Sequence, residues 1–281
     1  MSIATAPRRS ANRRNIHHAP LPAGAVVLAG VAVAFFALPL VGLITKAPWS
    51  QLWSTLTTHS SLEALRLSIT SALWATGFAI VFGVPLAWLL ARVPFPGRGV
   101  ARALCTLSMV LPPVVGGVAL FYALGRRGLV GQYLDRWLGI TLPFTTAGVV
   151  VAQTFVAMPF LVLTVEGAFR QMDVRYEEAA RTLGASRWYV FRHVTLPGIR
   201  PGLIAGAVLA FARALGEFGA TITFAGNFPG RTQTMPLAIY LANENNPDEA
   251  VMLSIVLIAV SFAVLVLLRE RFLSGLTGRA P

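Results

Sequence analysis

Residues Gln171 to Pro197 form a charged stretch, QMDVRYEEAARTLGASRWYVFRHVTLP, between two long apolar runs. Its first half places apolar residues one helical turn apart: Tyr176, Ala179, Ala180 and Leu183. Its other positions carry charge: Asp173, Arg175, Glu177, Glu178 and Arg181. This spacing predicts a short helix with one apolar face and one charged face. We call the whole stretch the 171–197 loop.

The 171–197 loop also contains start and stop signals for two helices. Asp173 is a candidate N-cap of the first helix, and Gly184 is a candidate C′ residue at which that helix stops. Ser186 can cap a second short helix, which we expect to end before Pro197. The sequence therefore predicts two short helices joined by a turn, lying in water beside a membrane.

Composition places the rest of the chain in a lipid bilayer. The 281 residues are 56% hydrophobic and 12% charged, whereas a soluble domain carries about 25% charged residues. Runs without charge cover 19–45, 67–91, 103–125, 137–165 and 250–268, and a sixth run from Pro201 is interrupted by Arg213 and Glu217. Each run can cross a hydrocarbon core of about 30 Å, which takes about 20 helical residues.

The sequence therefore predicts an all-α integral membrane protein with six transmembrane helices and a cytoplasmic helix-turn-helix loop. We expect a basic tail over 1–20, a membrane domain over 21–270 and a second tail over 271–281. With the N-terminus inside, sixteen of the 23 Lys and Arg residues lie in cytoplasmic segments and six in outer segments. This bias predicts that both termini and the 171–197 loop are cytoplasmic.

Several classes of function find no support in the sequence. Lys46 is the only lysine and follows no glycine-rich loop, so the chain has no P-loop for ATP hydrolysis. Cys105 is the only cysteine, and the four histidines lack metal-ligand spacing. We expect no catalytic residue, no metal and no cofactor in this chain. Its basic residues are scattered over the loops, which favours contact with lipid headgroups over nucleic acid.

The 171–197 loop resembles a known motif. Glu178, Ala179 and Ala180, then Gly184, then Val194 to Pro197 resemble the EAA loop of ABC importer permeases, with Val194 where that motif usually has Ile. The resemblance implies that this loop couples the permease to a cytoplasmic ATPase dimer, which binds ATP and Mg. It implies coupling roles for Glu178, Ala179, Ala180, Gly184, Leu196 and Pro197. The alternative is an ordinary amphipathic connector between two spans.

Further segments resemble molybdate importer permeases more narrowly. They are 109–117, 125–131, 212–224 and 226–240, of which Gly216 to Gly219 is shared with sulfate importer permeases. The resemblance implies a homodimer in a bacterial inner membrane and a periplasmic oxyanion-binding protein that delivers molybdate or tungstate. A sulfate-type importer is the nearer alternative. A channel or carrier that needs no ATPase is the more distant one.

Two groups of residues are candidates for the translocation path. Pro112 and Pro113 remove helix N–H donors, and Gly116 follows them, so we expect a third span that is kinked or locally unwound. This irregularity is either a packing feature or part of the path. Arg213 and Glu217 stand four residues apart inside a span. They either neutralise each other and fix helix packing, or line the path.

Other positions carry smaller expectations. Gly216 and Gly219 favour close helix packing over a hinge. Glu166 should be a solvated residue at the cytoplasmic boundary of its span. Candidate contacts with the binding protein lie in the outer loops: Arg126, Arg127, Asn227, Arg231 and Thr232.

Overall fold

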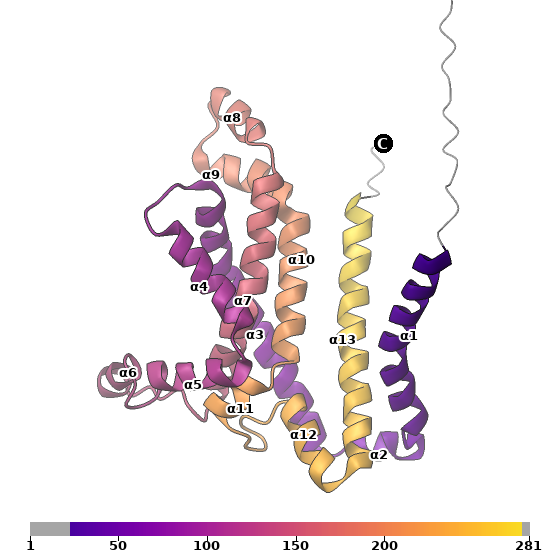
Figure 1. Ribbon diagram of the computed structural model, residues 1–281. Helices are drawn as coiled ribbons and strands as arrows, with labels where there is room; N and C mark the ends of the chain where they lie inside the picture. Colours follow the sequence, from indigo (N-terminus) through magenta and orange to yellow (C-terminus); the bar gives the residue numbers. More distant parts are fainter. Residues whose placement is uncertain (1–22, 277–281) are drawn as a thin grey trace, which may run out of the picture. The chain divides into compact units, whose positions relative to one another are not determined.

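The computed structural model describes residues 23–276, apart from the side chains of Leu265 and residues 267–276. The chain divides into two units, of which the first ends at Lys46. In that unit helix α1 (Ala23–Lys46) has 24 residues (Figure 1). At 1.5 Å per residue it is long enough to cross a bilayer. The tail predicted over 1–20 lies outside the described residues, as do the last five residues of the tail predicted over 271–281.

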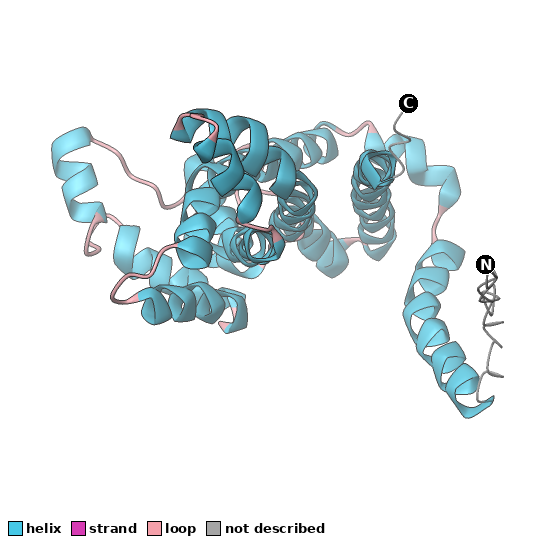
Figure 2. Cartoon of the chain, turned by 90° about the horizontal axis from the view of Figure 1, so that it is seen from above, coloured by secondary structure: helices cyan, strands magenta, loops and turns pink. Residues whose placement is uncertain are grey.

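The second unit, Ala47 to Pro281, consists of helices and connecting loops, and Figure 2 shows no strand among the described residues. Its helices are α2 (Leu52–Leu56), α3 (His59–Arg92), α4 (Arg98–Val110), α5 (Pro113–Leu124), α6 (Gly131–Leu138), α7 (Thr146–Gln171), α8 (Arg175–Thr182), α9 (Arg187–Val190), α10 (Leu196–Leu215), α11 (Gly219–Ala225), α12 (Met235–Asn245) and α13 (Pro247–Leu276). Thus the predicted all-α class is confirmed for the described part of the chain.

Among the described residues, five helical stretches are long and apolar enough to cross a membrane. They are 24–46, 59–92, 146–171, 187–215 and 247–264. They correspond to α1, α3, α7, the continuous α9 to α10 segment, and the first part of α13. The expected count of six spanning helices is therefore not confirmed among the described residues, because the third predicted run is not one helix.

The third run, 103–125, divides into α4 and α5 at Leu111 and Pro112. Two successive prolines supply no N–H for the helical hydrogen bonds, so α4 stops and Pro113 starts a new helix at the position where proline is tolerated. The span that was expected to be kinked or locally unwound is thus divided into two helices. With 13 residues, α4 alone is shorter than the roughly 20 residues of a full span.

The fourth predicted run, 137–165, also needs correction. Helix α7 begins only at Thr146, after Thr145, whose Oγ1 accepts the Gly148 N–H at 3.0 Å. This N-cap satisfies one of the free donors of the first turn. The helix then extends to Gln171, so the span lies several residues later in the chain than its hydropathy indicated.

The core of the second unit lies where α3, α7 and α10 pack together. Helix α3 presents small side chains to this core: Ala72, Ala75, Ala79, Gly83 and Ala87. A Cβ added to Gly83 would lie 3.0 Å from Leu161 Cδ2 of α7. Helices α3 and α7 therefore approach closely, as small residues permit in membranes. Within this unit, α8 and α9 lie at one end and α2 and α12 at the other (Figure 1).

Candidate functional site

The turn in the 171–197 loop has the predicted geometry. Gly184 follows α8 with φ +84°, the left-handed conformation that favours glycine at a helix end. Ser186 is the N-cap of α9, and its Oγ accepts the Tyr189 N–H at 3.3 Å. Asp173 lies one position outside its predicted place, because the N-cap of α8 is Val174. The Asp173 carboxylate still accepts the Arg175 N–H at 2.9 Å.

The second helix of the loop does not end before Pro197. Helix α9 continues through a π-turn, Phe191–Thr195, into α10, and the whole stretch from Arg187 to Leu215 is one continuous helix. Leu196 and Pro197 directly follow the π-turn, so the missing Pro197 N–H falls where the α-helical hydrogen-bond pattern is already interrupted. The loop is therefore continuous with a helix long enough to cross a membrane.

The charged face of α8 differs from the prediction at Glu177. This residue is 9% exposed, and the Thr195 hydroxyl donates to its carboxylate at 2.7 Å. The hydrogen bond joins α8 to the π-turn 18 residues later, so Glu177 supports the loop from inside instead of facing water. Glu178 and Ala179 are exposed, and Ala180 is half-buried.

The apolar face of α8 and the start of α9 are uncovered in this chain. Tyr176 is 66% exposed, Leu183 88% and Trp188 68%. Soluble surfaces seldom expose neighbouring large apolar side chains, and such patches mark binding surfaces. The exposed face therefore fits a partner protein docked on the 171–197 loop.

The candidate path residues meet around one cavity of about 170 Å³, which we call the Arg213 cavity. Its lining includes Pro112, Pro113, Gly116 and Arg213, and α7 contributes Phe155 and Phe160. Four of the five candidate residues thus come together although about 100 positions separate the first from the last in sequence. The arrangement places one guanidinium group in a cavity that is otherwise mostly apolar.

Glu217 completes this site from behind Arg213. The Arg213 Nη1 atom lies 2.7 Å from Glu217 Oε2, and Glu217 is 1% exposed. The other carboxylate oxygen accepts the Ala220 N–H at 2.8 Å, in the first turn of α11. Because α10 ends at Leu215, Glu217 lies in the break between two helices and not in a continuous span as expected. The ion pair offsets the cost of placing either charge in a low-dielectric region.

Helices α5 and α11 pack closely beside the Arg213 cavity. A Cβ on Gly219 would lie 2.8 Å from Pro113 Cβ, and one on Gly117 would lie 2.8 Å from the Ala220 carbonyl oxygen. The expectation of close packing therefore holds for Gly219. It fails for Gly216, whose added Cβ would meet only Ala212 O of the preceding helix, at 3.6 Å.

Glu166 is not the solvated residue we expected. It is 4% exposed, and its Oε1 lies 2.5 Å from Arg102 Nη2 and 2.7 Å from Arg170 Nη2. The Arg170 partner follows at i+4 and could have been found in the sequence. Arg102 is 64 residues away on α4, and no local pattern indicates it. Arg102 thus ties α4 to α7 through Glu166, whereas Arg170 pairs with Glu166 within α7.

The turn between α3 and α4 contacts the same region. Arg92 Nη2 donates to the Met172 carbonyl oxygen at 3.0 Å, where α7 ends and the 171–197 loop begins. Arg98 Nη2 and Arg102 Nη2 both donate to the Leu90 carbonyl oxygen, at 2.6 and 3.1 Å. These bonds satisfy a helix C-terminus with cations, as the helix dipole favours. Helix α4, which lines part of the Arg213 cavity, is thereby linked to the loop.

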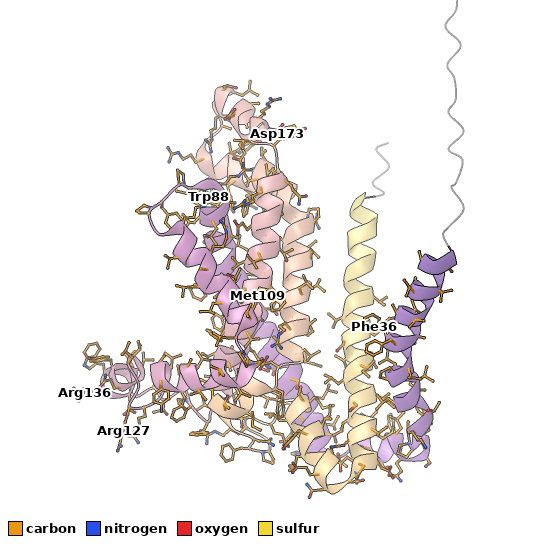
Figure 3. The ribbon with its side chains drawn as sticks, viewed as in Figure 1. Phe36, Trp88, Met109, Arg127, Arg136 and Asp173 are labelled. Atoms are coloured by element: carbon orange, nitrogen blue, oxygen red, sulfur yellow. The ribbon has the colours of Figure 1, made fainter. Side chains whose placement is uncertain are left out.

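The predicted binding-protein contacts divide into exposed and buried residues. Arg127 is exposed, and Figure 3 shows it near Arg136 in the region of α6. Arg126 is also exposed, and its Nε lies 2.9 Å from Asp135 Oδ2. Bonding to the Asp135 carboxylate raises the pKa of Arg126.

In the loop before α12, Arg231 is exposed, but Thr232 has no exposed surface. The Thr232 hydroxyl accepts the Phe228 N–H at 2.9 Å, so Thr232 holds this loop in shape and cannot be a surface contact as predicted. Asn227 is half-buried, with an Oδ1 that has no partner among the described residues. No group of three potential metal ligands gathers in the described part of the chain.

Comparison with known proteins gives three findings. Residues 79–276 match the family model described as binding-protein-dependent transport system inner membrane component. The chain is 49% identical to the molybdenum transport system permease protein ModB of Mycobacterium bovis over 87% of this chain and 92% of that protein. It is 38% identical to the sulfate transport system permease protein CysT of Escherichia coli K12, over 79% of this chain and 82% of that protein.

Solved structures show the same fold at low sequence identity. A chain of a bacterial alginate ABC transporter, in complex with an alginate pentasaccharide-bound periplasmic protein, aligns with a TM-score of 0.68 at 18% identity. The alignment covers 88% of this chain and 92% of that one. The arrangement of helices around the Arg213 cavity and the 171–197 loop therefore belongs to a known fold.

Proposed function

This chain belongs to the family of binding-protein-dependent transport system inner membrane components, and we propose that it is the permease subunit of an ATP-driven importer of molybdate or tungstate. The observation that carries the proposal is the 49% identity to a molybdenum transport permease over nearly the whole of that protein. The Arg213 cavity adds a physical reason, since it supplies a fixed cation for a dianion.

In the proposed mechanism, Arg213 attracts the oxyanion electrostatically inside a mostly apolar cavity. A charge in low-dielectric surroundings acts more strongly than in water, and rings or points of positive charge select anions in pores. Glu217 keeps the guanidinium oriented through the 2.7 Å ion pair and moderates its attraction. A moderate attraction suits a transporter, because the anion must leave the site as well as enter it.

We propose that the exposed apolar face of the 171–197 loop docks on a separate cytoplasmic ATPase, which binds ATP and Mg. Closure of the ATPase would push α8 and α9, and the movement would pass along the continuous helix into α10, which carries Arg213. The hydrogen bonds of Arg92, Arg98 and Arg102 would transmit the same movement to α4. Two copies of this chain around a common path, with α4 and α5 together forming a third, broken span, complete the proposed six-span arrangement.

The nearer alternative is a sulfate importer, which the 38% identity to a sulfate permease favours. Sulfate and molybdate are both tetrahedral dianions, so the cavity alone does not separate them. An ATPase-independent channel is less well supported, because it gives no reason for the uncovered apolar face of α8 and α9.

Selective uptake tests this proposal. The permease would be purified with the ATPase that accompanies it, reconstituted in liposomes and supplied with its binding protein and internal ATP. We expect molybdate uptake that tungstate competes for and a large excess of sulfate does not. Uptake of sulfate in preference to molybdate would establish the alternative, and uptake without ATP would contradict the importer mechanism.

A further inference from the structure

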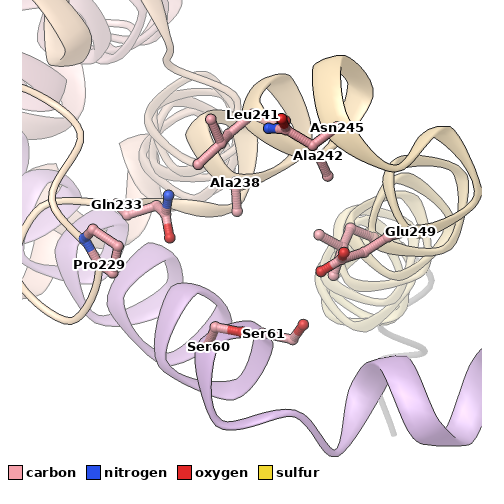
Figure 4. A pocket seen from close by; sticks show the side chains of 10 residues that line it. Ser60, Ser61, Pro229, Gln233, Ala238, Leu241, Ala242, Asn245 and Glu249 are labelled. Carbon is pink, nitrogen blue, oxygen red and sulfur yellow. The ribbon is translucent and has the colours of Figure 1, made fainter.

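A second cavity lies at the end of the second unit opposite the 171–197 loop. It has a volume of about 280 Å³ and opens between the start of α3, the loop before α12, and the junction of α12 with α13 (Figure 4). Its polar lining comes from Ser60, Ser61, Gln233, Asn245 and Glu249. We call it the Glu249 pocket.

Gln233 is a mostly buried residue of the pocket whose amide group can bond to a ligand. The residue is 6% exposed, and its amide group has no hydrogen bond within the described part of the chain. Figure 4 shows the amide directed toward the open space of the pocket. The amide is therefore accessible from the pocket and can bond to a ligand group that enters it.

The charge of the pocket indicates the kind of ligand. Glu249 is the one charged residue among those that line it, and the nearest polar contact to its Oε2 is Asn246 Nδ2 at 3.5 Å. Asn245 donates through its Nδ2 to the Leu241 carbonyl oxygen at 2.8 Å, which leaves its Oδ1 as an acceptor. A carboxylate and two amide oxygens suit a cationic group that carries several N–H donors.

The volume of the Glu249 pocket and its apolar lining further limit which ligand fits. Pockets for small molecules have volumes of about 300–1,000 Å³, so 280 Å³ is at the lower limit and suits a single long side chain. Ala238, Leu241 and Ala242 offer an apolar surface for the methylene stem of lysine or arginine. One carboxylate is too few for a divalent cation, which prefers several oxygen ligands of this kind.

We propose that the Glu249 pocket receives one arginine or lysine side chain of the periplasmic binding protein when that protein docks. This inference rests on the proposed function, because an importer whose ATPase docks on the 171–197 loop would receive its binding protein at the opposite end. A charge-assisted bond to Glu249 and the unpartnered Gln233 amide would make the side chain an anchor of the interface, a role in which arginine is common. Neighbouring exposed residues such as Arg231 would form the rim.

The test measures the dissociation constant of the molybdate-loaded binding protein with the intact permease–ATPase complex in lipid nanodiscs. Glu249→Gln should weaken binding about tenfold, the loss expected for one hydrogen bond to a charged group. Asp248→Asn is the matched control, because Asp248 is the exposed neighbour that does not line the pocket. It should change the dissociation constant by no more than about twofold, as for an exposed surface charge.

A variant with the opposite expected effect guards against a simple folding defect. Ser60→Asp adds a second carboxylate to the lining within the first turn of α3, where a negative charge also favours the helix. It should tighten binding, and a damaged protein would not bind more tightly. In addition, Glu249→Lys should abolish docking, and one Lys→Glu or Arg→Glu change on the binding protein should restore it.

The outcomes separate this inference from the proposed function. A parental complex that binds no loaded binding protein would overturn both. Docking by the parental complex, together with unchanged affinity in Glu249→Gln and in Ser60→Asp, would overturn the pocket assignment alone. Restoration by a charge-reversed binding protein would identify the side chain that enters the pocket.

Discussion

Three carboxylates are buried among the described residues, and each has a different kind of partner. Glu166 lies against two arginines, Glu177 accepts from a hydroxyl, and Glu217 joins an arginine to a backbone N–H. A carboxylate away from water is stable only when its oxygens are paired. Each of the three lies where two helices or two parts of a helix meet and holds these elements together.

Glu166 should contribute measurably to stability. In Glu166→Gln both arginines lose their charged partner, and breaking a fully buried pair costs about 3–5 kcal/mol. Since the Arg102 and Arg170 side chains are 35% and 49% exposed and can turn to water, we expect about 1–3 kcal/mol. Denaturant unfolding in detergent micelles would measure it, with exposed Glu178→Gln as the control. Equal stability of the two variants would contradict the role of Glu166 as a link.

Arg213 and Glu217 can be separated into packing and transport roles. The double variant Arg213→Met with Glu217→Gln keeps an oxygen acceptor for the Ala220 N–H and strands no charge, so we expect normal assembly. If Arg213 attracts the oxyanion, molybdate uptake by this variant should be lost while the ATPase remains bound. Each single variant should assemble less well than the double, because one charge stays unpaired.

The measurement is uptake per assembled complex, which corrects for differences in yield. Near-parental uptake by the double variant would show that the pair only fixes packing. This is the outcome that the sequence leaves open, since a pair four residues apart looks the same in either role.

The sequence indicates local partners of these residues and not distant ones. The spacing of Arg213 and Glu217 predicts their contact, and that of Glu166 and Arg170 would have done so. The partners of Glu166 on α4 and of Glu177 at Thr195 depend on how helices pack, which no local pattern contains. For the same reason the burial of Thr232 and Gln233 could not be read from their polar side chains.

At the level of elements, helix ends agree with their sequence signals better than helix lengths do. Gly184, Ser186 and the two prolines at 112 and 113 act where local chemistry places them, because a left-handed residue, a capping hydroxyl or a missing N–H each acts within one turn. Pro197 predicts a helix end, but α9 continues into α10 because a π-turn precedes the proline and changes the local hydrogen-bond pattern. Hydropathy alone also misplaced the start of α7.

The turn at Gly184 offers a test of coupling with a close control. A left-handed conformation costs a residue with a side chain about 1–2 kcal/mol, and a Cβ at Gly184 would meet no atom within 4 Å. The effect of Gly184→Val would thus come from the backbone, which would turn α9 away. We expect the complex to insert in the membrane but to lose uptake or its ATPase.

Gly139→Val is the matched control for this prediction. Gly139 has φ +64° and equally open surroundings, and it likewise follows a helix end, but that helix is α6, away from the 171–197 loop. Its variant should suffer similar strain and keep more of the uptake. ATP hydrolysis and molybdate uptake would be measured together for both variants. Equal transport by the two would mean that the 171–197 loop is only a connector.

On the scale of the whole molecule, the second unit has two chemically different ends. At one end the 171–197 loop, Arg92, Arg98 and Arg102 gather around the ends of α3 and α7. The other end holds α12 and the Glu249 pocket (Figure 1). Cytoplasmic segments of membrane proteins are enriched in Lys and Arg. The basic end, with its uncovered apolar face, should therefore be cytoplasmic, and the Glu249 pocket should face outward.

Cysteine labelling tests this orientation. In a variant whose buried Cys105 is replaced by Ala, single cysteines would be placed at Ser186 in the 171–197 loop and at Asn243 on α12, both of which are exposed. A membrane-impermeant thiol reagent applied to intact cells should label position 243 and not position 186, and both should react after the cells are opened. Both proposed contacts, the ATPase on the 171–197 loop and the binding protein at the Glu249 pocket, require this orientation. An ATPase can reach only a cytoplasmic loop and a periplasmic protein only an outer pocket, so labelling of position 186 from outside would invert the orientation and contradict both assignments.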